Sequence, residues 1–197
     1  MIKKYGWVGA LYLLYCVIRT KIIFSKARII RFPIDIRGKK HMQIGEGFTT
    51  GTNCRLEALP LTKTQGKTLT IGDNVQINDN VHITACQSVT IGNNVLLASK
   101  VYISDVSHGN YTVDINSSPY VPPAHRPLVA KPVIIENNVW LGDGVCILPG
   151  VIIGFGSVIG ANAVVTKNIP PLSIAVGIPA KIVKKFNATT NSWEKIC

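Results

Sequence analysis

The sequence predicts an all-β protein in which the chain winds as a parallel β-helix, and two observations support this class. Aliphatic residues recur at every sixth position between residues 71 and 170, and Gly, Asn and Asp fill the positions between them. Nothing in this region shows the spacing near 3.6 residues that a surface helix requires. A short N-terminal helical segment and one long inserted loop complete the predicted fold.

The N-terminal segment, residues 1–40, is both basic and apolar. It holds ten of the 21 lysines and arginines against a single acid, Asp35, so it carries most of the net charge of +11. The apolar run from Trp7 to Ile18 is too short for a hydrocarbon core of ~30 Å. Basic residues follow it at once, which argues against a cleaved signal. Two interpretations stay open: a helix packed on the body or on subunit partners, or an interfacial helix at an anionic membrane surface.

The hexapeptide pattern defines the main domain, residues 41–185. It is clearest in stretches that begin at Ile71, Ile91 and Ile135, with a weaker copy from Ile44. The first residue of each hexapeptide and the fifth, usually Val, are expected to point inward. Gly, Asn and Asp tolerate left-handed backbone at a sharp corner. Three hexapeptides make one triangular coil, and stacked coils pair as short parallel strands around a ladder of aliphatic side chains.

Two breaks interrupt the repeats. Residues 59–68 look like a small polar loop. Residues 109–132 form a longer loop that contains five prolines, and a loop of this length between regular coils indicates a lid or arm that shapes a site. After the repeats, residues 186–197 form a tail in which a short helix around Trp193 is possible.

Composition excludes several classes of protein. The five cysteines are scattered, with no CxxC pair, which indicates neither a disulfide framework nor a zinc site and is typical of a reducing compartment. The basic charge lacks the aromatic and basic interleaving of a nucleic-acid surface, so no nucleic-acid partner is expected.

The repeats resemble the hexapeptide-repeat acetyltransferases, and most of all the O-acetyltransferases of lipopolysaccharide (O-antigen) and capsule biosynthesis. The resemblance covers roughly residues 43 to 185 and includes Ile-Gly-Asn-Asn-Val-Leu-Leu-Ala, Ser-Asp-Val-Ser-His-Gly, Asn-Asn-Val-Trp-Leu-Gly and Gly-Ile-Pro-Ala-Lys-Ile-Val. It implies a left-handed coil, a homotrimer with active sites between adjacent β-helices, acetyl-CoA as co-substrate and no metal.

The same resemblance places the catalytic base at His108, just before the long loop. An imidazole with a pKa near ~6.5 is mostly neutral at cytoplasmic pH and can take the proton of a sugar hydroxyl as that hydroxyl attacks a thioester. His82 is the weaker candidate for the base and is expected to line the cleft. His125 in the long loop either reaches a neighbouring subunit's site or is solvated. Asp105 either orients the imidazole or caps a turn.

Substrate and cofactor residues also follow from the resemblance. Asn78 and Trp140 are expected to bind the acceptor with His82, and Cys86 stands where the galactoside enzyme has an acceptor-binding carboxylate, which suggests a different acceptor. The resemblance points to these residues for CoA: Ala98, Asp143, Ala161, Thr166, Lys167 and Lys184. Lys167, with Lys181 or Lys184, would face the nucleotide phosphates.

The predicted function is O-acetylation of a sugar of a surface polysaccharide or of its lipid-linked oligosaccharide precursor, in the cytoplasm or peripherally at the inner membrane face. N-acetylation of a nucleotide-linked amino sugar is an alternative. A non-catalytic β-helix scaffold is an alternative of another class. The sequence leaves open which sugar and which acyl group react.

Overall fold

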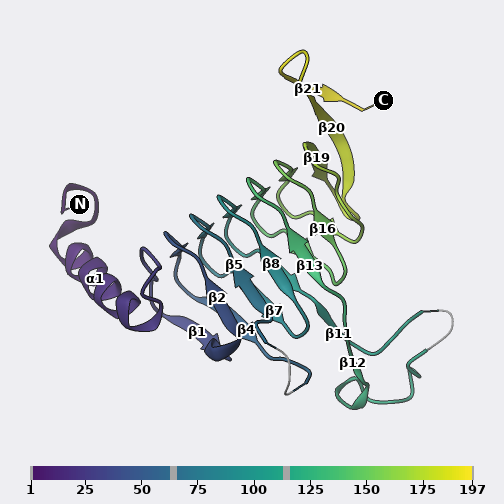
Figure 1. Cartoon of the computed structure of the whole chain (residues 1–197), viewed down its shortest axis with the longest axis horizontal. Coiled ribbons are helices and arrows are strands. Elements are labelled where there is room, and N and C mark those ends of the chain that lie inside the picture. Colours follow the sequence, from purple (N-terminus) through teal and green to yellow (C-terminus); the bar gives the residue numbers. More distant parts are fainter. Residues whose placement is uncertain (1, 63–65, 113–115, 197) are drawn as a thin grey trace.

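The protein winds as a three-sided coil of short parallel strands, with a helix at one end and a hairpin at the other (Figure 1). The computed structural model describes residues 2–62, 66–112 and 116–196. Strands of successive coils stack on the same side, so each side of the coil is one parallel sheet. We call these sheets face 1, face 2 and face 3, in the order in which the chain first visits them.

Within the described ranges, face 1 has six strands, face 2 has five, and face 3 has six parallel strands followed by two antiparallel ones. Face 1 contains β1 (Ile34–Arg37), β4 (Cys54–Ala58), β7 (His82–Ala85), β10 (Tyr102–Ser104), β15 (Cys146–Ile147) and β18 (Val164–Val165). Face 2 contains β2 (Met42–Ile44), β5 (Leu69–Ile71), β8 (Val89–Ile91), β13 (Val133–Ile135) and β16 (Ile152–Ile153). Face 3 contains β3 (Thr49–Thr50), β6 (Gln76–Ile77), β9 (Leu96–Leu97), β14 (Trp140–Leu141), β17 (Val158–Ile159), β19 (Ser173–Val176), β20 (Lys181–Asn187) and β21 (Ser192–Lys195).

The predicted inward positions form the core. The hexapeptide leaders Ile71, Ile91 and Ile135 and the fifth-position valines Val75 and Val95 are all at most 1% exposed. Equivalent residues pair across coils, as in the register Leu69–Val89 and Ile71–Ile91 between β5 and β8. The periodicity prediction is therefore confirmed over the repeats.

The corners between faces use left-handed backbone, as the composition predicts. Asn74, Asn80, Asn94 and Asn138 have φ between 54° and 60°. Asn tolerates this conformation better than most residues with a side chain, because its short polar side chain can bond locally. Lys100, at φ 61°, is an exception.

A long arm, residues 106–130, leaves the coil where a corner between faces 1 and 2 is expected. It begins with β11 (Val106–His108), which pairs antiparallel with β12 (Leu128–Ala130), and it contains the 3₁₀ turn η2 (Pro123–His125). Figure 1 shows the arm extending away from the stack of coils. Residues 113–115 of the predicted loop, like residues 63–65 of the shorter one, lie outside the described residues.

The N-terminal segment is the helix α1 (Ile2–Ile23), with non-helical backbone at Gly6. It is followed by β1 and the short turn η1 (Lys39–His41). The expectation that the apolar run is too short to cross a bilayer is wrong, because the helix continues past Arg19 to Ile23. The 18 residues Gly6–Ile23 have a mean hydropathy of 1.3 and are long and apolar enough to cross a membrane, with 17% of that stretch buried.

The C-terminal prediction of a helix around Trp193 is also wrong. That residue lies in β21, which pairs antiparallel with β20, and its ring contacts Phe186 with 5.3 Å between centroids. Alternating exposure along β20 is typical of a hairpin with one covered face.

Candidate active site

His108 is the last residue of β11, on the arm, and its side chain is exposed. Within the described residues the imidazole makes no hydrogen bond, while its backbone is fixed by pairing with Leu128 of β12. A histidine held by its main chain, with an exposed ring that makes no hydrogen bond in the described part of the chain, can accept a proton from a ligand that reaches the arm.

Two residues of the arm hold the chain beside His108. The Tyr111 hydroxyl donates to the carbonyl oxygen of His108 at 2.7 Å, and Arg126 Nη1 donates to the Tyr111 hydroxyl at 2.7 Å. Arg126 Nε also donates to the carbonyl oxygen of Val121 at 2.8 Å. Sequence reasoning missed both residues. Their contacts join parts of the arm 15 residues apart, and the sequence holds no signal for such a pairing.

Asp105 caps a turn and does not orient the His108 ring. Its buried carboxylate accepts three backbone N–H groups, from Cys86 at 2.8 Å and from Gln87 and Ser88 at 2.7 Å each. These three residues form the corner of the preceding coil. Asp105 therefore closes that corner and, through its carbonyl oxygen, accepts the N–H of Lys131 at 2.7 Å where the arm returns.

Four of the predicted ligand-binding residues lie along one edge of the coil, between faces 3 and 1. We call this edge corner 3/1. Asn78, Ala98, Asp143 and Ala161 each follow a strand of face 3 in successive coils. The coils are tied together here by backbone bonds, such as Asn78 N–H to Leu97 O and Ala98 N–H to Leu141 O, both 2.9 Å. The structure thus brings together residues that are 83 positions apart in the sequence.

Free backbone donors mark this corner. The Asp143 carboxylate accepts the N–H of Ser99 at 2.9 Å, as a corner side chain of this fold commonly does. Ala161 stands at the same place in the next coil and has no side-chain acceptor, so the N–H of Asp143 is without a partner among the described residues. The N–H of Ala161 is also without a partner in that part of the chain. These exposed donors can receive carbonyl oxygens of a ligand.

Asn78 also lines a cleft of about 470 Å³ between this corner and helix α1. Tyr12 and Leu13 supply the helix wall, and Gln76 donates to the Asn78 side-chain oxygen at 3.3 Å. The helix is therefore part of the surroundings of the predicted acceptor residue, which the sequence alone did not indicate.

His82 and Trp140 lie on two different faces. Trp140 is 50% exposed on face 3, between Leu96 and Val158 in the register. His82 is on face 1, where its Nε2 lies 3.0 Å from the carboxylate of Glu57 and its ring contacts Tyr102 edge-on at 5.3 Å. The contact with Glu57 ties the His82 ring to a structural carboxylate. Because they lie on different faces, His82 and Trp140 do not meet within one chain.

Glu57 is the centre of a charged cluster that the sequence did not reveal. Its carboxylate lies 3.0 Å from both Arg37 and Arg55 and also accepts the Thr84 hydroxyl at 3.0 Å. Burial acts to raise the pKa of Glu57, but the hydrogen bonds from His82 and Thr84 and the charge of Arg55 outweigh it and hold the pKa below its ordinary value.

Thr166, Lys167 and Lys184 complete the predicted set, and the structure separates them from corner 3/1. Thr166 and Lys167 follow β18 at the edge between faces 1 and 2, which we call corner 1/2, and both are exposed. Thr166 and the base of the arm line a cavity of about 300 Å³. Lys184 is on β20, opposite Ile174. The predicted phosphate contacts Lys167 and Lys184 therefore lie on different sides of one chain.

Corner 1/2 and corner 3/1 are the two edges of face 1. Asp105 lies five positions after Lys100 across this face, which at strand geometry is roughly 16 Å. His108 lies on the arm that leaves corner 1/2. Corner 3/1 holds Asn78, Ala98, Asp143 and Ala161.

Three of the five thiols, those of Cys54, Cys86 and Cys146, are unsuited to carry an acyl group. Burial, reinforced by the charges of Asp105 and Glu57, raises the pKa of Cys86 to about 11. Burial also raises the pKa of Cys54 and of Cys146. At neutral pH these side chains are therefore protonated and weakly nucleophilic. No group of three or more His, Cys, Asp or Glu side chains suited to a metal occurs among the described residues.

Known proteins share both the sequence and the fold. Residues 132–167 match the family described as bacterial transferase hexapeptide (six repeats). The chain is 45% identical over 195 residues to WbbJ of Escherichia coli (strain K12), whose provisional name is lipopolysaccharide biosynthesis O-acetyl transferase, and the match covers 98% of this chain and 96% of WbbJ. It is 38% identical over 156 residues to galactoside O-acetyltransferase of the same strain, covering 76% of this chain and 70% of that one.

Solved structures agree. A galactoside acetyltransferase in complex with coenzyme A has a TM-score of 0.57 and 27% identity, covering 87% of this chain and 71% of that one. The N-acyltransferase AntD of Bacillus cereus has a TM-score of 0.70 over 87% of this chain and 88% of that one, and at 19% identity it shows likeness of fold alone. The protein is an acyltransferase built on a parallel β-helix. It belongs to the hexapeptide-repeat transferase family.

Proposed function

We propose that the protein is an O-acetyltransferase that moves an acetyl group from acetyl-CoA to a sugar hydroxyl of a surface polysaccharide or of its lipid-linked precursor. The observation that carries the proposal is the placement of His108. Its exposed imidazole is free of partners within the described residues, on a backbone fixed by β12 and Tyr111. The similarity to WbbJ over nearly the full chain supports the class of acceptor.

The acyl donor is a CoA thioester, and corner 3/1 fits its pantetheine arm. Ala98 leaves room beside the backbone, and the free N–H groups of Asp143 and Ala161 would donate to the amide carbonyls of the arm. Lys167 and Lys184 would meet the nucleotide phosphates as point charges. When bound, the thioester supplies an activated acyl group.

His108 would take the proton of the acceptor hydroxyl as the oxygen attacks the thioester carbonyl, and would return it to the departing sulfur. The new bond is the ester C–O bond and the broken bond is the thioester C–S bond. Asn78 would orient the acceptor, with Trp140 and His82 along its path. The raised pKa of Cys54, Cys86 and Cys146 supports direct transfer, without an acyl-enzyme.

The two groups of residues support a homotrimer. If corner 1/2 of one subunit meets corner 3/1 of the next, His108 faces Asn78 and Asp143 without a ligand crossing the width of face 1. His125, exposed on the same arm, would then also lie near the neighbouring subunit. A left-handed sense of the coil belongs to this proposal. Sedimentation should give a mass near three times 21.4 kDa, and a stable monomer would contradict this arrangement.

We place the enzyme in the cytoplasm, with α1 in peripheral contact with the inner membrane face. The apolar and exposed surface of α1 and the basic residues after it support this location. Loss of membrane association after removal of residues 1–30 would support it, and unchanged association would contradict it.

The test is release of the CoA thiol from acetyl-CoA by wild type, His108→Ala and His125→Ala, with a panel of free and lipid-linked sugars. We expect His108→Ala to lose about 10²–10⁴-fold in turnover, because it removes the general base. His125→Ala is the matched control, since it removes an exposed histidine of the same arm.

Equal activity of His108→Ala and wild type would overturn the role of this residue. Turnover only with nucleotide-linked amino sugars would replace O-acetylation by N-acetylation. No turnover with any acceptor, together with no CoA binding by calorimetry, would favour a scaffold.

A further inference from the structure

A groove of about 730 Å³ runs between the C-terminal part of α1 and β1, further along the helix than the Asn78 cleft. Its walls are mostly apolar and include Ile22, Phe32 and Ile34, and its charged residues are Arg19 and Lys39. Resting on the proposed function, we propose that this groove binds the phosphate and adjoining hydrocarbon of a membrane lipid, the lipid that carries the acceptor sugar.

The two cations of the groove lack acidic partners among the described residues. The Arg19 guanidinium stacks on Phe32, 4.1 Å from the ring centroid, and donates to the Tyr15 hydroxyl. Lys39 Nζ lies 5.4 Å from the centroid of Phe24. The nearby acid Asp35 is paired with Arg37 at 2.7 Å and with Arg55 at 3.5 Å. The groove thus offers two uncompensated positive charges above an apolar floor, which matches an anionic amphiphile.

The outer surface of α1 extends this apolar floor. Ile22 is 78% exposed and Trp7 is 73% exposed. From residue 6 onward, the exposed large apolar residues of the helix are Trp7, Val8, Leu11, Leu14, Tyr15, Val17, Ile18 and Ile22. A contiguous apolar surface of this kind on a soluble domain marks an interaction site.

The helix is held to the coil along its second half. The Tyr12 hydroxyl donates to the carbonyl oxygen of Phe32 at 2.6 Å, and the N–H of Ile30 donates to the Thr20 hydroxyl at 2.7 Å. Lys21 Nζ donates to the carbonyl oxygen of Ala27 at 2.9 Å. Because the helix is fixed, a lipid phosphate at Arg19 lies on the same helix that borders the Asn78 cleft.

Charge favours a lipid over a second copy of this chain. The first forty residues hold ten basic residues and one acid, so two copies of this surface repel each other. Several carboxylates elsewhere are already engaged with the protein's own backbone, among them Asp73, Asp79 and Asp105. An anionic lipid surface supplies the missing negative charge.

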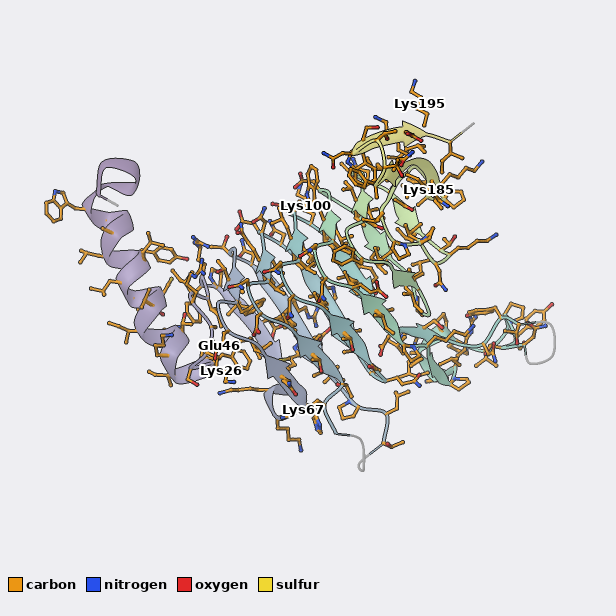
Figure 2. The ribbon with its side chains drawn as sticks, turned by 45° about the horizontal axis from the view of Figure 1, so that its top comes forward. Lys26, Glu46, Lys67, Lys100, Lys185 and Lys195 are labelled. Carbon is orange, nitrogen blue, oxygen red and sulfur yellow. The ribbon has the colours of Figure 1, made fainter. Side chains whose placement is uncertain are left out.

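The test compares binding of the full chain to phosphatidylcholine vesicles with and without phosphatidylglycerol. Arg19→Gln with Lys39→Gln removes two charges from the groove. Lys185→Gln with Lys195→Gln removes two charges from the opposite end of the molecule, as Figure 2 shows, and serves as the matched control. We expect the groove variant to lose about 30-fold in affinity for the anionic vesicles, because each of the two cations contributes about fivefold and the two factors multiply. The control should bind as wild type does.

A second variant, Ile22→Glu, tests the apolar floor without a folding risk, since this side chain is mostly exposed. We expect it to weaken vesicle binding as well. Equal loss in both double variants would show general charge attraction and overturn the groove. A change of sedimentation mass in the groove variants would show that a second copy covers this surface, which also overturns the proposal.

Activity separates this inference from the proposed function. The groove variant should keep wild-type turnover with a water-soluble sugar and lose it with a lipid-linked acceptor in vesicles. Equal turnover on the vesicle acceptor would overturn the groove while leaving acetyl transfer intact. If no acceptor is turned over by wild type, the proposed function fails, and vesicle binding still decides whether the groove holds lipid phosphate.

Discussion

Two corners of the same coil are built differently. The edge between faces 2 and 3, which we call corner 2/3, carries a continuous side-chain ladder in which Asp73, Asn93 and Asn137 each accept a backbone N–H of the preceding coil at 2.7–2.8 Å. Corner 3/1 carries the same kind of bond at Asp79 and Asp143, at 2.6 and 2.9 Å. At Ser99 and Ala161, which stand between and after these acids, the ladder is interrupted.

The two corners differ in how many backbone N–H groups are left for a ligand. At corner 2/3 the backbone N–H groups of Glu46, Asp73 and Asn93 each donate to a side chain of the following coil, so none of these three donors is free for a ligand. At corner 3/1 the interruption leaves the N–H groups of Asp143 and Ala161 exposed, beside the residues that the family resemblance assigns to CoA. We infer that irregularity in an otherwise repetitive fold identifies the binding edge.

The largest expected effect is on the continuous corner. A Cβ at Gly72 would lie 2.3 Å from Asn93 Oδ1 and 2.8 Å from the backbone carbon of Gly92, so Gly72→Ala forces the coils apart. We expect a loss of about 2–3 kcal/mol in the free energy of unfolding, measured by urea denaturation. Gly66→Ala is the control, because a Cβ there meets nothing within 4 Å. Equal stability of the two variants would refute the tight stacking of this corner.

The features that the sequence predicts are those that depend on residues close together in the chain. The hexapeptide period places Ile71, Val75 and their equivalents, because each buried position depends only on its local repeat. The role of Asp105 depends on a turn 17–19 residues earlier, and the Glu57 cluster includes Arg37 and Thr84, which are 20 and 27 positions from Glu57. Such pairs have no periodic signal, so sequence reasoning left the first open and missed the second.

The site shows the same limit. The family resemblance points to Asn78, Ala98, Asp143 and Ala161 one by one as candidate binding residues, and only the coil geometry shows that they share an edge. The sequence did not indicate the roles of Tyr111 and Arg126, because their partners depend on how the arm folds back on itself.

The second prediction concerns face 1, which lies between the two proposed binding edges and carries the charged cluster of Glu57. Glu57→Gln removes the charge that pairs with Arg37 and Arg55, and we expect a loss of about 1–2 kcal/mol at pH 7. The folded-state pKa of Glu57 is below its ordinary value of 4.5, so its contribution is fully present above that pH and is lost as the pH falls through the folded-state pKa.

Thermal or urea unfolding of wild type and Glu57→Gln from pH 7 to pH 3 measures the contribution of Glu57 to the free energy of unfolding. The gap between wild type and Glu57→Gln should be constant above pH 5 and should narrow below pH 4.5. A gap that widens on acidification would show that the cluster is not stabilised by the charged form of Glu57.

The third prediction concerns a variant that gives corner 3/1 the side-chain acceptor found at corner 2/3. Ala161→Asn places an amide oxygen where Asn137 has one at corner 2/3, so that it can accept the N–H of Asp143. We expect the KM for acetyl-CoA to rise about fivefold, since one neutral hydrogen bond is worth roughly 1 kcal/mol, while stability is unchanged or slightly higher.

Asn137→Ala is the reciprocal control. It frees the N–H of Asn93 at corner 2/3 and should lower stability by about 1 kcal/mol without changing the KM for acetyl-CoA. A raised KM in this control, or an unchanged KM in Ala161→Asn, would place the CoA path elsewhere.

The smallest expected effect is at Lys100, on the exposed upper edge in Figure 2. Its φ of 61° is the left-handed value that Asn80 adopts at the same place in the preceding coil and Asn162 adopts two coils further on. A lysine gains no local hydrogen bond there and bears more strain than asparagine. Lys100→Asn should therefore raise the free energy of unfolding by about 0.5–1 kcal/mol, and Asn80→Lys should lower it by a similar amount. Urea denaturation of both variants measures the pair. Opposite changes of similar size would show that corner 3/1 tolerates strain at this one position, whereas a destabilised Lys100→Asn would show that the lysine side chain contributes contacts that outweigh the strain.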